Sequence, residues 1–167
     1  MATTQRSSRR RLAVVLASSA AVGVLGAATT VPAVAHDNDH RDHRSRNRLS
    51  ATLTGAKEVP GPADADGQGR ARVRLRQGQV CFTLSWRNIA APMAAHIHKA
   101  PSDQPGPVVV TLLSAPGGLG APVSSVGGCA VVDAALVADI RKNPRAYYVN
   151  IHNADFPGGA IRGQLHR

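Results

Sequence analysis

The sequence predicts an all-β protein, an antiparallel sandwich or barrel with one short helix near residues 133–142. From Leu49 onward, short apolar runs alternate with Gly and Pro, a spacing typical of many short strands. One of these runs, residues 70–76, alternates perfectly between polar and apolar side chains. Only residues 133–142 have helical character, and Asn143-Pro144 ends them.

The alternating run predicts a hairpin. Residues 70–76 read RARVRLR, so the apolar side chains face inward and the four arginines face outward. Gln77-Gly78 is a two-residue connection of the kind that favours a hairpin, and residues 80–86 supply the returning strand. Further strands are expected around residues 50–55, 94–98, 107–113, 146–151 and 160–166.

The first 35 residues have the pattern of a cleaved secretory signal. An arginine-rich head precedes an uncharged stretch over residues 12–25 and the cleavage motif Ala33-Val34-Ala35. We expect a secreted or extracytoplasmic protein, exported by the Sec route or, because residues 8–12 read SRRRL, by the twin-arginine route. The uncharged stretch is shorter than the roughly 20 residues that span a bilayer, so no stable membrane span is expected.

Residues 36–48, HDNDHRDHRSRNR, predict a disordered, charged, His-rich tail, because they contain no apolar side chain to bury. Residues 49–167 are then long enough for one domain. The tail histidines are either transition-metal ligands or part of a solvated spacer, and the spacer is the preferred interpretation. Four of the 20 Lys and Arg lie in the signal, so part of the formal charge of +10 is lost with it.

The outward arginines of residues 70–76 also allow two interpretations. A row of guanidinium groups suits a polyanionic cell-surface ligand, whereas charge on an exposed strand discourages edge-to-edge aggregation. The second is the preferred interpretation. The chain has only two Phe, two Tyr and one Trp, too few to stack nucleic-acid bases, so no nucleic-acid partner is expected.

Cys81 and Cys129 are the only cysteines, and an exported protein meets an oxidising compartment. We therefore expect them to form a disulfide, with their Cα atoms about 4.4 to 6.8 Å apart.

His96-Ile97-His98 is the clearest candidate for chemistry. In a strand, His96 and His98 project from the same face, and two aligned imidazoles are the start of a metal site, although they also occur in folds without a metal. The chain has no G-x-S-x-G elbow and no P-loop, and its carboxylates are sparse, so a hydrolase is not expected and no catalytic residue is assigned.

Five separated motifs, in order, resemble the CHRD domain, which is named after chordin. They are residues 49–60 (LSATLTGAKEVP), 96–98 (HIH), 106–109 (GPVV), 148–152 (YVNIH) and 156–164 (FPGGAIRGQ). The resemblance implies a CHRD domain over residues 49–166 of an exported, bacterial-looking protein. It does not carry over the growth-factor binding of chordin. One departure is Lys99, which stands where the family has glycine after His-Ile-His.

The same features resemble, more distantly, the Greek-key sandwich of copper-zinc superoxide dismutase. This resemblance implies an antiparallel Greek-key β-sandwich, and it makes His96 and His98 the match for the paired copper ligands, with His152 as a third. The full copper-zinc site needs further histidines and an aspartate, and no histidine lies between His98 and His152.

Arg162 lies in a strand that should be partly buried. A buried guanidinium needs a carboxylate or several carbonyl oxygens, and we expect its partner to be Glu58 or Asp155, in a structural role.

The sequence thus predicts an exported CHRD domain with a non-catalytic binding or structural role, whose partner is an unknown protein or a polyanionic cell-surface ligand. The alternative is a mononuclear copper- or zinc-binding protein, with superoxide dismutase-like oxidoreductase activity as its extension, that uses His96, His98 and His152.

Overall fold

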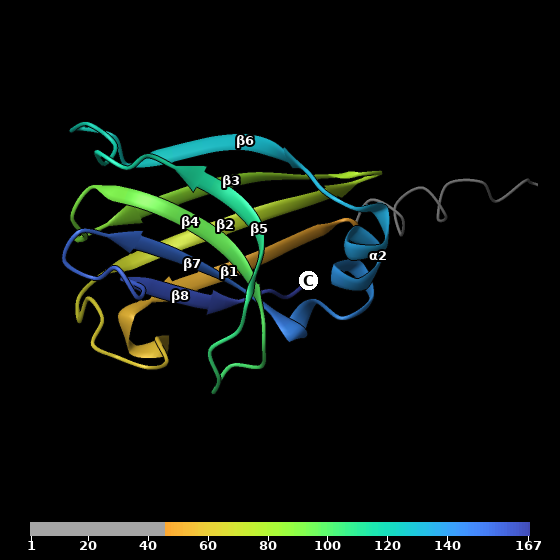
Figure 1. Cartoon of the computed structure of the whole chain (residues 1–167), viewed down its shortest axis with the longest axis horizontal. Helices are drawn as coiled ribbons and strands as arrows, with labels where there is room; N and C mark the ends of the chain where they lie inside the picture. Colours follow the sequence, from red (N-terminus) through yellow and green to blue (C-terminus); the bar gives the residue numbers. More distant parts are fainter. Residues whose placement is uncertain (1–45) are drawn as a thin grey trace, which may run out of the picture. The chain divides into compact units, whose positions relative to one another are not determined.

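A computed structural model describes residues 46–167, and Figure 1 shows its strands and helix. The predicted signal peptide and residues 36–45 of the predicted tail lie outside the described residues. The strands are β1 (Arg48–Thr54), β2 (Gln68–Arg76), β3 (Gln79–Arg87), β4 (Pro92–Lys99), β5 (Val108–Ser114), β6 (Ser125–Val131), β7 (Tyr147–Asn153) and β8 (Ile161–Gln164). Helix α2 (Ala134–Lys142) follows β6. Two short 3-10 turns complete the described part: η1 (Gly55–Lys57) follows β1, and η2 (Pro144–Ala146) follows α2.

The strands form a single antiparallel sheet in the order β5-β4-β7-β8-β1-β2-β3-β6. The sheet curls so that its edge strands, β5 and β6, approach each other and nearly close it (Figure 1). The connections from β3 to β4 and from β6 to β7 each bypass two strands across this gap, as in a Greek key. Within residues 46–167, the predicted all-β, antiparallel fold with one short helix is therefore confirmed, with one continuous sheet in place of two separate ones.

The β2–β3 hairpin forms as its alternation predicts. The apolar residues of β2 and β3 are buried in the core, while the arginines at positions 70, 72, 74 and 76 are exposed. Gly78 occupies the turn with φ +67°, a backbone conformation that glycine adopts without a steric penalty.

Helix α2 also begins and ends where the sequence predicts. The Asp133 side chain accepts a hydrogen bond from the backbone N–H of Ala135, which caps the first turn of α2. Val137 and Ile140 are buried against the sheet. Within residues 46–167, no helix is both long and apolar enough to cross a bilayer.

Strand β6 was not predicted, because its sequence, SVGGCAV, has adjacent glycines and no regular alternation. It forms by pairing with β3, and this pairing places Cys129 directly opposite Cys81. The predicted disulfide is confirmed, but the Cα atoms are 3.9 Å apart, closer than the expected range. The separation is short because the two cysteines face each other on neighbouring paired strands.

The disulfide closes a loop between residues 48 positions apart in the chain. In the chain-entropy model, this cross-link restricts the unfolded state by about 4 kcal/mol. We expect the double variant Cys81→Ser, Cys129→Ser to lose roughly this amount of unfolding free energy, measured by denaturant titration. A loss below about 1 kcal/mol would show that the cross-link adds little to this sheet.

Candidate metal centre

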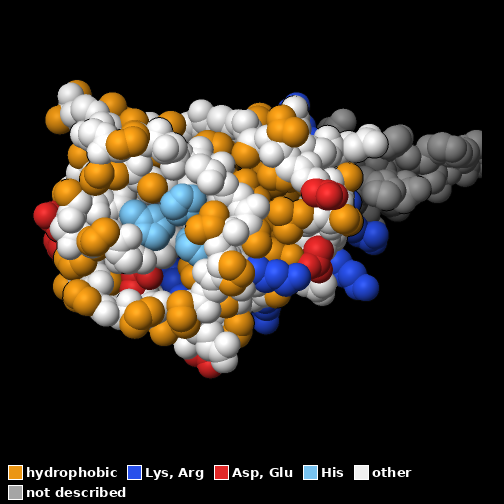
Figure 2. All heavy atoms as spheres, viewed as in Figure 1, with side chains coloured by type: hydrophobic (Ala, Val, Ile, Leu, Met, Phe, Trp, Pro, Cys, Tyr) orange, Lys and Arg blue, Asp and Glu red, His pale blue; other side chains and the backbone are white. Residues whose placement is uncertain are grey.

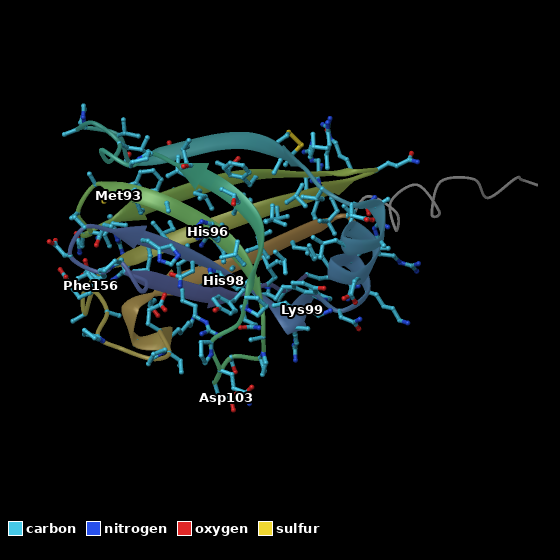
Figure 3. All side chains as sticks on the ribbon, in the orientation of Figure 1. Met93, His96, His98, Lys99, Asp103 and Phe156 are labelled. Atoms are coloured by element: carbon cyan, nitrogen blue, oxygen red, sulfur yellow. A yellow bond between two sulfur atoms is a disulfide. The ribbon has the colours of Figure 1, made fainter. Side chains whose placement is uncertain are left out.

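The outward face of β4 and β7 carries the candidate site. Ala95 and Ile97 of β4 and Val149 and Ile151 of β7 point into the core, so the residues between them point outward. These outward residues are His96 and His98 on β4 and Tyr148, Asn150 and His152 on β7. Figure 3 shows His96 and His98 along β4, and Figure 2 shows the histidine side chains at the molecular surface on this side.

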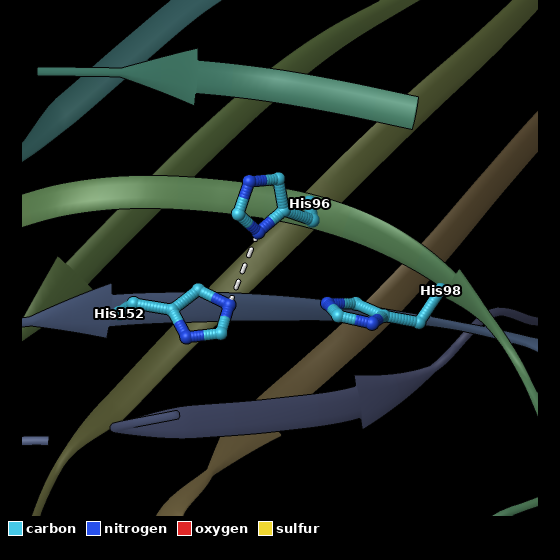
Figure 4. Close-up of side chains that lie close together, drawn as sticks. All are labelled: His96, His98 and His152. Atoms are coloured by element: carbon cyan, nitrogen blue, oxygen red, sulfur yellow. Dashed lines mark hydrogen bonds between the residues drawn. The ribbon is translucent and has the colours of Figure 1, made fainter. Parts of the chain in front are cut away.

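The three predicted histidines lie together. One ring nitrogen from each of His96, His98 and His152 lies within 4.8 Å of the others. Figure 4 shows the closest pair, His96 Nδ1 and His152 Nε2, which are 3.2 Å apart. Two nitrogens that bind one metal tetrahedrally at 2.0 to 2.1 Å are roughly 3.3 Å apart, so this pair already has a suitable spacing.

Backbone carbonyls fix the orientation of two of the rings. His98 Nδ1 lies 2.9 Å from the Gly106 carbonyl oxygen, and His152 Nδ1 lies 3.0 Å from that of Pro157. A carbonyl only accepts, so each Nδ1 must donate, and each Nε2 keeps its lone pair when the ring is neutral. His98 Nε2 is buried and has no hydrogen-bond partner within residues 46–167. A metal ion would satisfy this nitrogen.

The surroundings favour neutral imidazoles, the form that binds metals. Burial lowers the pKa of His96 to about 4, and the neighbouring rings of His152 and His98 add to the effect. Burial also lowers the pKa of His98 and of His152.

Gly106, in the loop between β4 and β5, fixes the orientation of the His98 ring. Its carbonyl accepts from His98 Nδ1, and its N–H donates to the Tyr148 hydroxyl at 3.1 Å. A Cβ at this position would lie 2.2 Å from the Lys99 carbonyl oxygen, so only glycine allows this approach. The rings of His98 and Tyr148 stack with centroids 4.7 Å apart.

Arg162 is fully buried beside this stack. Its Cζ lies 3.4 Å from the centroid of the Tyr148 ring. Its guanidinium donates to the carbonyl oxygens of Pro101 and Gln104, each at 2.8 Å, and of Val59 at 3.4 Å.

The prediction that Arg162 pairs with Glu58 or Asp155 was wrong as to its hydrogen bonds. Within the described part of the chain, neither carboxylate forms a hydrogen bond or ion pair with it, because the loop carbonyls occupy the guanidinium. Glu58 still lies near enough for the positive charge of Arg162 to act on its pKa.

Glu58 instead accepts a hydrogen bond from the Asn150 side-chain amide at 3.3 Å through Oε2, while its Oε1 is buried and unpaired within residues 46–167. Burial raises the pKa of Glu58 to about 7, against the opposing effects of Arg162 and Asn150. Tyr148, Asn150 and Gly106 were not singled out as site residues from the sequence. The alternation in residues 148–152 places Tyr148, Asn150 and His152 on one face, and this was the available signal.

The described part of the molecule is therefore a Greek-key β-protein with three histidines gathered on the outside of two strands. The sequence model of the CHRD domain matches residues 49–165, and the chain belongs to the CHRD domain family. Comparison with curated proteins and with solved structures found no match.

The raised pKa of Glu58 predicts a pH-dependent contribution to stability. The folded state holds the Glu58 proton more tightly than the unfolded state, whose pKa is near 4.5, so this contribution falls as pH rises from about 4.5 through about 7. Glu58→Gln should remove that fall. Thermal unfolding at pH 5 and pH 8 is the measurement, with the exposed Asp103→Asn as control.

The melting temperature of Glu58→Gln minus that of the parent should be higher at pH 8 than at pH 5. The same difference for Asp103→Asn should not rise between the two pH values. An equal difference between Glu58→Gln and the parent at both pH values would contradict the raised pKa.

Proposed function

We propose that this chain is an exported CHRD domain that binds one copper or zinc ion through His96, His98 and His152. The observation that carries the proposal is the approach of one nitrogen from each ring to within 4.8 Å of the others. Copper and zinc are the metals proposed because imidazole nitrogens are suitable ligands for both.

The alternative is a histidine cluster that only fills the surface of the sheet. In that case each buried ring nitrogen should have a protein partner, as buried polar atoms usually do. His98 Nε2 has none within residues 46–167, although the Nδ1 of the same ring is well bonded. In His98, Nδ1 is hydrogen-bonded to the backbone and Nε2 is unpaired beside two other imidazoles. This arrangement is typical of a histidine that binds a metal.

The proposal is limited to a binding role. Three imidazoles leave a coordination position open, which an ion uses to bind water or another ligand. The group consists of three histidines, whereas the full copper-zinc site of superoxide dismutase needs further histidines and an aspartate. We therefore propose no catalytic step.

Export is the second part of the proposal. It rests on the N-terminal pattern of residues 1–35 and on the disulfide between Cys81 and Cys129, which suits an oxidising compartment. Detection of the protein outside the cytoplasm, with a new N-terminus near His36, is the direct test.

The metal site predicts a stoichiometry of one. Protein purified without a histidine tag and loaded with Cu²⁺ or Zn²⁺ should retain about one ion per chain in elemental analysis after dialysis. His98→Ala should lose at least tenfold in affinity, measured by calorimetric titration, because it removes one of the three ligands.

Two controls locate the site. His166→Ala, at an exposed histidine outside the group, should bind as the parent does. Replacement of His36, His40 and His43 by Ala should also leave this ion in place. Unchanged binding in His98→Ala, with binding lost when the tail histidines are replaced, would move the metal to the tail and refute the proposal.

Tyr148→Phe tests the support behind His98. The change removes the hydroxyl that accepts from the Gly106 N–H but keeps a ring to stack on His98. Loss of such an outer partner typically lowers metal affinity by about 10- to 100-fold, and we expect a loss near the lower end. Tyr147→Phe is a matched control, because its hydroxyl bonds Asp139 instead. Equal affinities for the two variants would contradict a positioning role for Tyr148.

A further inference from the structure

The outer face of β1, β2, β3 and β6 carries positive charge without any negative charge. These four strands contain no Asp and no Glu. The arginines on them that are exposed to solvent are Arg48 on β1, Arg70, Arg72, Arg74 and Arg76 on β2, and Arg87 on β3. We call the four on β2 the arginine row.

The structure removes the simplest explanation for this row. Charge on a strand prevents aggregation when that strand is at the edge of a sheet. β2 is not an edge strand, since it pairs with β1 along one side and with β3 along the other. The edge strands are β5 and β6, and neither contains a charged residue. The preferred interpretation of the row as protection against edge pairing was therefore wrong.

The charges of the row are not neutralised within residues 46–167. The ion pair in this part of the chain joins Lys99 to Asp139 and includes no arginine of the row. Arg74 lies directly opposite Arg48 on β1, and like charges in such cross-strand positions repel each other. An anionic group between the two would relieve that repulsion.

Short hydroxyl side chains border the row. Arg72 lies between Ser50 on β1 and Thr83 on β3, and Arg70 lies between Thr52 and Ser85. Two surface hollows follow the row. One, of about 630 Å³, is lined in part by Arg48, Arg72, Arg74 and Arg76, and the other, of about 280 Å³, by Arg70 and Arg87. Guanidinium forks flanked by hydroxyl donors match the oxygens of sulfate and phosphate groups.

The spacing of the row indicates an extended ligand. Alternate residues of a strand lie about 6.8 Å apart, so the row from Arg70 to Arg76 is about 20 Å long. Single-stranded nucleic acid is the less suitable polyanion, because Phe82 and Trp86, the aromatic residues of these four strands, are buried on the other side of the sheet and offer no stacking platform.

We infer that the arginine row binds an extended, non-nucleic-acid polyanion that carries repeated sulfate or phosphate groups. This binding is independent of the proposed metal site, which lies on β4 and β7. The sulfate or phosphate groups align with successive guanidinium groups, and the hydroxyls of β1 and β3 donate to the remaining oxygens.

The test measures binding of the purified protein to heparin, to inorganic polyphosphate and to single-stranded and duplex DNA at 150 mM salt. The first two probes distinguish sulfate from phosphate as the preferred group. The double variant Arg72→Gln, Arg74→Gln should lose at least tenfold in affinity for the better of them. Its affinity should also depend less steeply on salt, because fewer counterions are released.

The matched control is Lys142→Gln, Arg145→Gln, which removes the same charge at exposed positions of α2 and η2. It should change the affinity less than about twofold. Because Arg72 and Arg74 lie outside the core, neither double variant should melt at a lower temperature than the parent, and this measurement excludes unfolding as the cause of lost binding.

Three results would overturn the inference. Equal losses in the two double variants would mean that the ligand responds only to net charge. Single-stranded or duplex DNA bound as tightly as heparin and polyphosphate would identify a nucleic-acid surface. No binding of the purified protein to heparin or to polyphosphate at 150 mM salt would leave the row without the proposed kind of ligand.

Discussion

Arg162 carries a charge that cannot be neutralised at any physiological pH, and it lies inside the molecule. The chain meets this constraint by bringing carbonyl oxygens from two loops to the guanidinium, Val59 after η1 and Pro101 and Gln104 between β4 and β5. The Tyr148 ring lies against it. The loop between β4 and β5 that Arg162 fixes also contains Gly106, which holds His98. The orientation of a candidate metal ligand therefore depends on a buried charge in another strand.

The polar side chains on the outward face of β4, β7 and β8 form one layer, which loops cover. Cross-strand pairing sets His96 beside Asn150, and Asn150 beside Arg162. His98, in the same way, lies beside Tyr148. Each residue of this layer supports a neighbour, so the three histidines are held by the sheet register as well as by their own hydrogen bonds. A site built on paired strands is more rigid than one built on loops alone.

The predictable part of the fold is the part governed by local pattern. The β2–β3 hairpin follows from strict alternation and a turn glycine, and α2 follows from its cap and the proline beyond it. Strand β6 has no such pattern, because it lies at an edge, has no buried side chain among its seven residues and obtains its order from pairing with β3. Its existence is a property of the sheet.

The same limit applies to the site. The His-x-His spacing predicts two rings on one face, and resemblance to known families added His152. The roles of Gly106 and Tyr148 depend on a loop folding back over β4, which no local pattern encodes. The prediction for Arg162 recognised the need for a partner but chose carboxylates by their place in the motifs, whereas nearby backbone oxygens supply the hydrogen bonds.

The disulfide gives the sheet a mechanical property. Residues 115–124 join the two edge strands, so a force applied to this loop would pull on β6 from Ser125. The backbone pairing of β6 with β3 would then separate one residue pair at a time, from Ser125 toward Cys129. There a covalent bond to Cys81 takes the load. An edge strand without a buried side chain is thus tied to its neighbour by a covalent bond, and separation from this edge stops before the opposite end of β3 is exposed.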